Sequence, residues 1–241
     1  MTKAFSFILI LQFLVVSICF TQSSKHTVTI YLNNVAGNKI LNIDSSYINA
    51  SGEMFRLRKF KYYISNIQLT DSVSGKKENF PFYFLVDEAD SASKKILLQT
   101  YLHQITSIQF LLGVDSIKNV SGVQTGTLDP SKGMFWTWNS GYVMAKIEGF
   151  SPAANTAQHS FEWHVGGYKK NEVTAKKISL QIQDTALQKS NYFKINADVL
   201  KWFDGKTVIA IAKNPMCHSP GALAVSIADN YATMFSVDYA K

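Results

Sequence analysis

The sequence predicts an all-β protein, an antiparallel β-sandwich of about ten strands with one C-terminal helix. Three observations lead to this prediction. Short segments rich in β-branched and aromatic residues recur along the chain, with pieces rich in Gly, Pro, Asn, Asp and Ser between them. Aromatic residues make up 13% of the 241 residues, which favours β-structure. Helical spacing of apolar residues occurs in one substantial segment, 221–235.

The predicted strands follow one another at 26–34, 55–70, 82–87, 95–100, 105–114, 142–150, 160–168, 173–183, 192–200 and 207–213. Within 173–183, Ile178, Leu180 and Ile182 share one face, and the residues between them are polar or charged. Burial of one face only is typical of antiparallel sheets. The helix prediction over 221–235 rests on apolar side chains that recur every three or four residues after Pro220.

Residues 1–21 are predicted to be a signal peptide, and 22–241 a single domain. Lys3 precedes an apolar run of 14 residues, which is short for a membrane span but fits the core of a secretory leader. We therefore expect a periplasmic or secreted protein with no membrane span in the mature chain. A lipoprotein site at Cys19 is less favoured, because Ile18 stands where a small residue is needed.

The formal net charge of +7 comes from lysines scattered over the sequence rather than from a basic cluster. This pattern indicates a solvated surface and argues against a nucleic-acid partner. Hydrophobic residues at 46% and charged residues at 17% are ordinary for a globular protein. Once the leader is removed, Cys217 is the remaining cysteine, so the mature chain has no internal disulfide.

Candidate metal ligands lie in two segments. In FEWHVGGY the candidate ligand is His164, and alternation along the predicted strand places Glu162 on the same face. In NPMCHSPG, Met216, Cys217 and His218 offer thioether, thiolate and imidazole donors, a set that suits copper. Two other interpretations remain open. His164 could be a hydrogen-bonded histidine at a strand end, and NPMCHSPG could be a loop whose Met and Cys are buried.

The stretch GMFWTWNSGY holds Trp136 and Trp138 two residues apart. These rings are suited to core packing, to a stacking platform, or to redox chemistry on the indoles. The standard hydrolase, nucleotide-binding and zinc-protease motifs are absent from the sequence, so we do not expect an enzyme.

Several blocks resemble the methanobactin-associated (MbnP-like) copper-binding proteins, in a Bacteroidetes-type branch. They are FRLRKFKYYISNIQL, GVDSIKNVSG, LDPSKGMFWTWNSGYVMAKIEG, FEWHVGGY and IADNYATMFSV, which together span about residues 54–237. The resemblance implies an exported β-rich protein that binds one copper ion. It also implies a di-haem, peroxidase-like partner that oxidises a tryptophan to kynurenine, here Trp136 or Trp138. His164 in the HVG block is the ligand that the resemblance favours most.

The chain departs from the better-known branch of that family in two ways. Four cysteines of that branch are absent here, and Asn119–Val120 stands where that branch has Asn-His. If that histidine is a ligand, His218 with Met216 and Cys217 must take its place. The copper hypothesis therefore depends on a second donor near His164. The competing hypothesis is a periplasmic or cell-surface interaction module that binds protein or glycan without metal.

Overall fold

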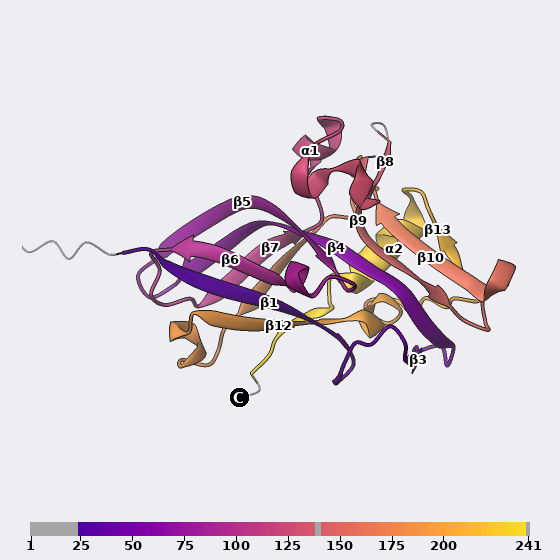
Figure 1. Cartoon of the computed structure of the whole chain (residues 1–241), viewed down its shortest axis with the longest axis horizontal. Coiled ribbons are helices and arrows are strands. Elements are labelled where there is room, and N and C mark those ends of the chain that lie inside the picture. The colour runs from indigo at the N-terminus through magenta and orange to yellow at the C-terminus, as the bar shows by residue number, and fades with distance from the viewer. Residues whose placement is uncertain (1–23, 138–140, 240–241) are drawn as a thin grey trace, which may run out of the picture.

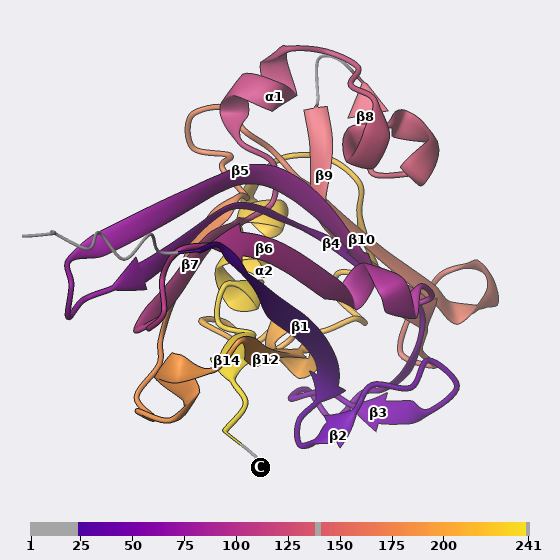
Figure 2. The ribbon, with the colours of Figure 1, turned by 60° about the vertical axis from the view of Figure 1, so that its left-hand side comes forward.

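The computed structural model describes residues 24–137 and 141–239. Two mixed β-sheets form a sandwich-like body (Figure 1). The main helix, α2 (Ala222–Tyr231), packs beside the strand β10 and the short helix that follows β12. Figure 2 shows β1, β6 and β12 as one layer and β4, β5 and β7 as the layer beyond it.

The smaller sheet has five strands in the order β14–β12–β1–β2, with β6 also paired to β1. Its first strand pairs with β12 in parallel and with β6 antiparallel. The bounds are β1 His26–Ala36, β2 Lys39–Ile40, β6 Lys95–Thr100, β12 Tyr192–Asp198 and β14 Phe235–Val237.

The larger sheet has nine strands in the order β11–β7–β4–β9–β10–β13; β3 and β5 pair with β4, and β8 pairs with β9. The edge pair β10–β13 is parallel. The bounds are β3 Ser46–Ile48, β4 Met54–Asp71, β5 Lys76–Asp87, β7 Ser107–Leu112, β8 Phe135–Thr137, β9 Gly141–Phe150, β10 Ser160–Gly166, β11 Lys176–Gln181 and β13 Met216–Cys217.

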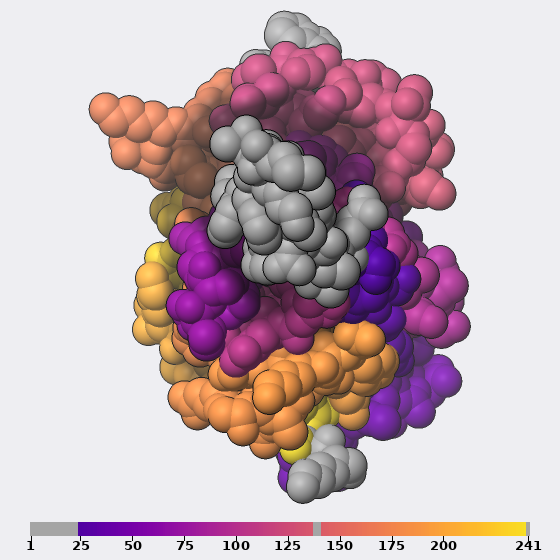
Figure 3. Space-filling model, turned by 90° about the vertical axis from the view of Figure 1, so that its left-hand side faces the viewer, coloured from indigo at the N-terminus to yellow at the C-terminus, as the bar shows by residue number. Residues whose placement is uncertain are grey.

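Short helices connect the strands. They are α1 Ser116–Val120, η1 Ser91–Lys94, η2 Gly126–Leu128, η3 Pro130–Lys132, η4 Ala157–His159, η5 Leu187–Lys189 and η6 Val199–Trp202. The segment from α1 to β8 stands out on one side of the sheets in Figures 1 and 2, and its pink atoms form the upper right of the space-filling view (Figure 3).

The β-rich class, the sandwich-like arrangement and the C-terminal helix are confirmed, but the expectation of purely antiparallel sheets is wrong. Two parallel pairs, β1–β12 and β10–β13, join segments far apart in the chain. Tight hairpins impose antiparallel pairing on sequence neighbours and place no such constraint on distant segments. Strand alternation in the sequence does not reveal which distant partner a strand will take.

The segment 207–213 was expected to be a strand, and it is instead a bridged turn. Its alternation is real, because Ile209 and Ile211 are buried. However, the amides of Ile211 and Ala212 donate to the carboxylate of Glu53 at 2.6 and 2.9 Å. A side chain therefore satisfies the backbone donors that a sheet ladder would otherwise pair.

The inward faces of the strands build an aromatic core that fixes the orientation of β10. Phe161 and Trp163 of this strand are fully buried against Phe203, with Trp163 and Phe203 centroids 5.0 Å apart. The intervening side chains of β10, Glu162 and His164, consequently lie on the outer face of the larger sheet.

Within the described residues, no helix is long and apolar enough to cross a membrane.

Candidate metal centre

Two imidazoles meet on the outer face of the larger sheet. The ring centroids of His164 and His218 are 4.5 Å apart, and their planes make an angle of 32°. His164 lies on β10, and His218 directly follows β13. Sequence spacing alone could not give this proximity, because residues 165–217 separate the two positions in the chain.

The parallel pairing of β10 with β13 explains why the imidazoles meet. Glu162 lies opposite Met216, and Trp163 lies opposite Cys217. The next step along both strands brings His164 and His218 to the same level. Two hydrogen bonds hold this register. The backbone amide of Glu162 donates to the carbonyl of Pro215 at 2.8 Å, and the indole N–H of Trp163 donates to the carbonyl of Asn214 at 2.6 Å.

A carboxylate completes a group of three donors. Glu162 Oε2 lies 3.2 Å from His218 Nε2, and one ligand atom from each of Glu162, His164 and His218 lies within 4.8 Å of the other two. Metal–nitrogen and metal–oxygen bonds of about 2.0–2.2 Å put two ligands of one ion at most about 4.4 Å apart, so the three donors would have to close in on an ion that they bind together. The alternation in FEWH placed Glu162 beside His164, but we had not predicted it to be a ligand.

A second carboxylate, Glu148 on β9, orients His164. Its Oε1 accepts a hydrogen bond from His164 Nε2 at 3.0 Å, and its Oε2 lies 2.7 Å from Arg58 Nη2. The hydrogen bond from His164, together with the nearby ammonium of Lys59, holds the pKa of Glu148 well below its usual range. With its proton on Nε2, the His164 imidazole has its lone pair on Nδ1, the nitrogen that could then bind a metal.

The same guanidinium ties the two carboxylates together. Arg58 Nη2 also lies 3.0 Å from Glu162 Oε1, so Arg58 bridges Glu148 and Glu162. Burial and the neighbouring imidazole of His164 lower the pKa of His218, although Glu162 acts in the opposite direction. A neutral imidazole is the form that coordinates metal.

The tryptophan segment lies directly beside the histidine strand. A Cβ placed on Gly166 would lie 2.8 Å from Cζ3 of Trp136 and 2.7 Å from the carbonyl oxygen of Tyr142. The indole of Trp136 therefore packs against the backbone two residues beyond His164. Trp138, the other candidate for oxidation, lies outside the described residues.

Lys146 connects the tryptophan segment to the centre. It pairs with His164 across β9 and β10, and its side chain is only 9% exposed. Its ammonium donates to the carbonyl of Gly133, which precedes the strand that carries Trp136. Burial lowers the pKa of Lys146.

The structure separates the two sulfur candidates. Cys217 points into the hydrophobic core with Trp163 and is buried, whereas Met216 is 44% exposed and paired with Glu162 on the side of the histidines. Burial raises the pKa of the Cys217 thiol to about 11. The alternation of side chains along β13 puts Cys217 on the face opposite the two imidazoles, so it is not in the group that they form with Glu162.

The pair Asn119–Val120 has a structural role. The side chain of Asn119 is buried, accepts the amide of Tyr142 at 2.8 Å and donates to the carbonyl of Val114. Val120 is 65% exposed. Asn119 thus anchors α1 to the start of β9.

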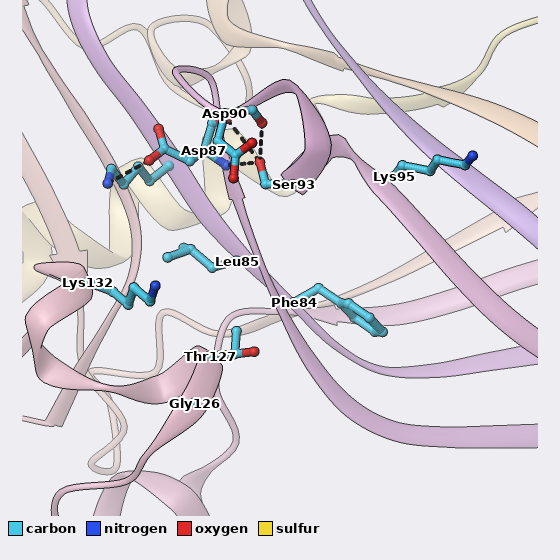
Figure 4. Close-up of a pocket in the computed structure, with 10 residues that line it drawn as sticks. Phe84, Leu85, Asp87, Asp90, Ser93, Lys95, Gly126, Thr127 and Lys132 are labelled. Carbon is cyan, nitrogen blue, oxygen red and sulfur yellow. Dashed lines mark hydrogen bonds and ion pairs between the residues drawn. The ribbon is translucent and has the colours of Figure 1, made fainter.

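A cleft of about 520 Å³ with both polar and apolar lining opens further along the same sheet (Figure 4). Lys61 and Asp87, an ion pair at 2.7 Å, line it together with Lys132. Lys61 lies opposite Lys146 on the neighbouring strand, so the cleft belongs to the same outer face as the histidine centre.

The donors present fit a copper ion. Two imidazoles and one carboxylate suit copper or another divalent transition metal, and the partial exposure of all three side chains leaves a path for entry. Second-layer contacts to Glu148 and Arg58 are of the kind that orient metal ligands.

Comparison with known proteins identifies the fold and the family. The MbnP family model matches residues 25–219. The chain belongs to the MbnP family. The structure of MbnP from Methylosinus trichosporium is similar, with a TM-score of 0.60 at 15% identity, covering 88% of this chain and 98% of that one. No curated protein matches the sequence. The family resemblance drawn from the sequence blocks is confirmed.

Proposed function

We propose that this MbnP-family chain is an exported copper-binding protein in which His164, His218 and Glu162 hold one copper ion. The observation that supports the proposal most is the 4.5 Å separation of the two imidazole centroids, together with the carboxylate of Glu162 on β10 beside His218. It supplies the second donor that His164 needs. The chain would bind metal without turnover of its own.

The position of Trp136 supports a second part of the proposal, in which a tryptophan is oxidised to kynurenine by a di-haem, peroxidase-like partner. In the balanced reaction, one tryptophan and two molecules of hydrogen peroxide give kynurenine, formate and water. Ring opening would create an amine and a carbonyl close to Gly166 and the imidazoles. Trp136 and Trp138 both remain candidates.

The test is metal analysis of the chain exported to the periplasm, with and without a co-expressed di-haem partner. His164→Ala and His218→Ala should each bind one equivalent of copper fewer than the wild type. His159→Ala is the matched control, because its imidazole contacts the carbonyl of Ala154 on a different loop. Unchanged copper content in both variants would refute the site.

Peptide mass spectrometry tests the oxidation separately. The expected result is a kynurenine mass on the peptide that carries Trp136 or Trp138, present only after co-expression with the partner. Trp136→Phe and Trp138→Phe then distinguish the two positions. Unmodified tryptophans at both positions would refute the oxidation and leave the histidine site to be judged by its own test.

A further inference from the structure

The residues at the start of β1 form a second candidate metal site. We propose that signal peptidase hydrolyses the bond between Ser23 and Ser24, two residues beyond the leader boundary expected from the sequence, and that the new terminus, Ser24–Lys25–His26, binds a Cu(II) ion. This inference rests on the export proposed above. Thr21 and Ser23 are small residues at the third and first positions before that bond, as the cleavage pattern requires.

The chemistry follows from a histidine in the third position of a free amino terminus. The α-amine of Ser24, the amide nitrogens of Lys25 and His26, and the imidazole of His26 can close three adjacent chelate rings around one ion. Both amides lose their protons on binding, and the α-ammonium loses one as well. A square of four nitrogens is the geometry that Cu(II) and Ni(II) prefer.

In the structure the first two residues of the proposed terminus are exposed, and one imidazole nitrogen of His26 is unpaired. Ser24 and Lys25 are exposed, and His26 is the first residue of β1. Nδ1 of His26, the nitrogen that closes a chelate ring with its own amide, is buried and has no hydrogen-bond partner among residues 24–137 and 141–239, so a bound ion would satisfy it. The ring of His103 stacks on the His26 ring at 5.1 Å, with 11° between the planes, which holds the imidazole at this end of the strand.

Binding would disturb only the end of the sheet. His26 pairs with Thr100 in the last rung between β1 and β6. The amide of Thr29 points to β12, where it donates to the carbonyl of Asn191 at 2.8 Å, so alternation directs the amide of His26 toward β6. Deprotonating this amide therefore removes a donor from the terminal rung and leaves the remaining ladder intact.

The two sites differ in the donor atoms that they offer to copper. Deprotonated amides stabilise Cu(II), whereas the centre at His164 and His218 offers imidazoles and a carboxylate without an amide nitrogen. The terminal ion should give the visible and electron paramagnetic resonance spectra of square-planar nitrogen coordination. These spectra distinguish it from an ion at the centre.

The experiment uses the whole chain exported with its own leader. Intact mass and N-terminal sequencing should show a mature chain that begins at Ser24. In a His164→Ala/His218→Ala background, Cu(II) titration should reach one equivalent with the square-planar spectrum. Lys25→Pro removes a required amide proton, and His26→Ala removes the imidazole, so each should abolish that equivalent. His159→Ala should retain it.

An inserted alanine between Ser24 and Lys25 provides a second test without removing any side chain. It moves His26 to the fourth position and should also abolish the square-planar spectrum. A mature terminus other than Ser24, or a spectrum that survives Lys25→Pro and the insertion, would overturn the inference. The His164→Ala and His218→Ala variants report separately on the copper centre, so either proposal can fail while the other stands.

Discussion

The imidazole of His164 donates to the buried carboxylate of Glu148, with 3.0 Å between Nε2 and Oε1. The same carboxylate forms an ion pair with Arg58, which also pairs with Glu162. One buried anion therefore orients one candidate ligand directly and a second through a shared guanidinium. The donors at this centre are held by contacts that exist without a metal.

Replacing Glu148 tests this arrangement. Glu148→Gln should weaken copper binding by about 10–100-fold, since second-layer partners of metal ligands typically have effects of this size. Competition titration against a chelator of known affinity measures the change. Glu172→Gln, on the loop after β10, is the control. Equal affinities in the Glu148→Gln variant and the wild type would show that Glu148 does not position the ligand.

Glu148 also predicts how stability without metal depends on pH. Its pKa lies well below the usual 4.5, so above pH 4.5 the carboxylate is ionised in both states and the full stabilisation is present. As the pH falls below 4.5, the unfolded chain takes up the proton first, and the free energy of unfolding decreases. Urea denaturation above and below pH 4.5 should show this fall in the wild type and a smaller one in Glu148→Gln. If the free energy of unfolding fell equally with pH in the two proteins, Glu148 would not be the source of the pH dependence.

The contact between Gly166 and Trp136 predicts a local packing defect. Gly166→Ala places a methyl group 2.7 Å from the Tyr142 carbonyl and 2.8 Å from the indole, which requires both to move. We expect a loss of about 1–3 kcal/mol in the free energy of unfolding, as in other overpacked sites. Denaturation gives the loss, and tryptophan fluorescence reports on the environment of the ring.

A double-mutant cycle separates the ring from the backbone. Trp136→Ala removes the indole, so Gly166→Ala should cost less in that background than in the wild type. The remaining cost measures the contact with Tyr142. Additive effects of the two substitutions would mean that the indole does not pack on Gly166 in solution.

The sequence predicted the face of β10 correctly, because alternation along FEWHV depends only on strand geometry. It also identified the individual segments of His164 and His218. It could not bring these segments together, since their meeting depends on a two-residue strand, β13, that pairs in parallel with β10. The role of Glu148 depends on the register between β9 and β10, which the sequence does not reveal.

Cys217 shows that residue type alone does not predict which side chains can act as metal ligands. Met216, Cys217 and His218 are adjacent in the sequence, yet the strand directs the thiol to the core and the imidazole to the outer face. A two-residue strand is too short to display an alternating pattern that could be read in advance. The segment 207–213 was mispredicted for a different reason: its alternation is present, but Glu53 rather than a neighbouring strand pairs the backbone amides of Ile211 and Ala212.

The burial of Cys217 yields a prediction about its reactivity. Its thiol pKa is raised to about 11, so at pH 8 little thiolate is present, and the buried sulfur is shielded from reagents. Alkylation of the folded mature protein should be slow and should become rapid in urea. Cys217→Ala should leave the copper stoichiometry unchanged while lowering the free energy of unfolding by about 0.5–3 kcal/mol, the range of most single substitutions. If Cys217→Ala instead lost copper while remaining folded, or if the native thiol reacted as fast as the unfolded one, the sulfur would have to reach the metal. The register of β13 against β10 would then differ from the one described.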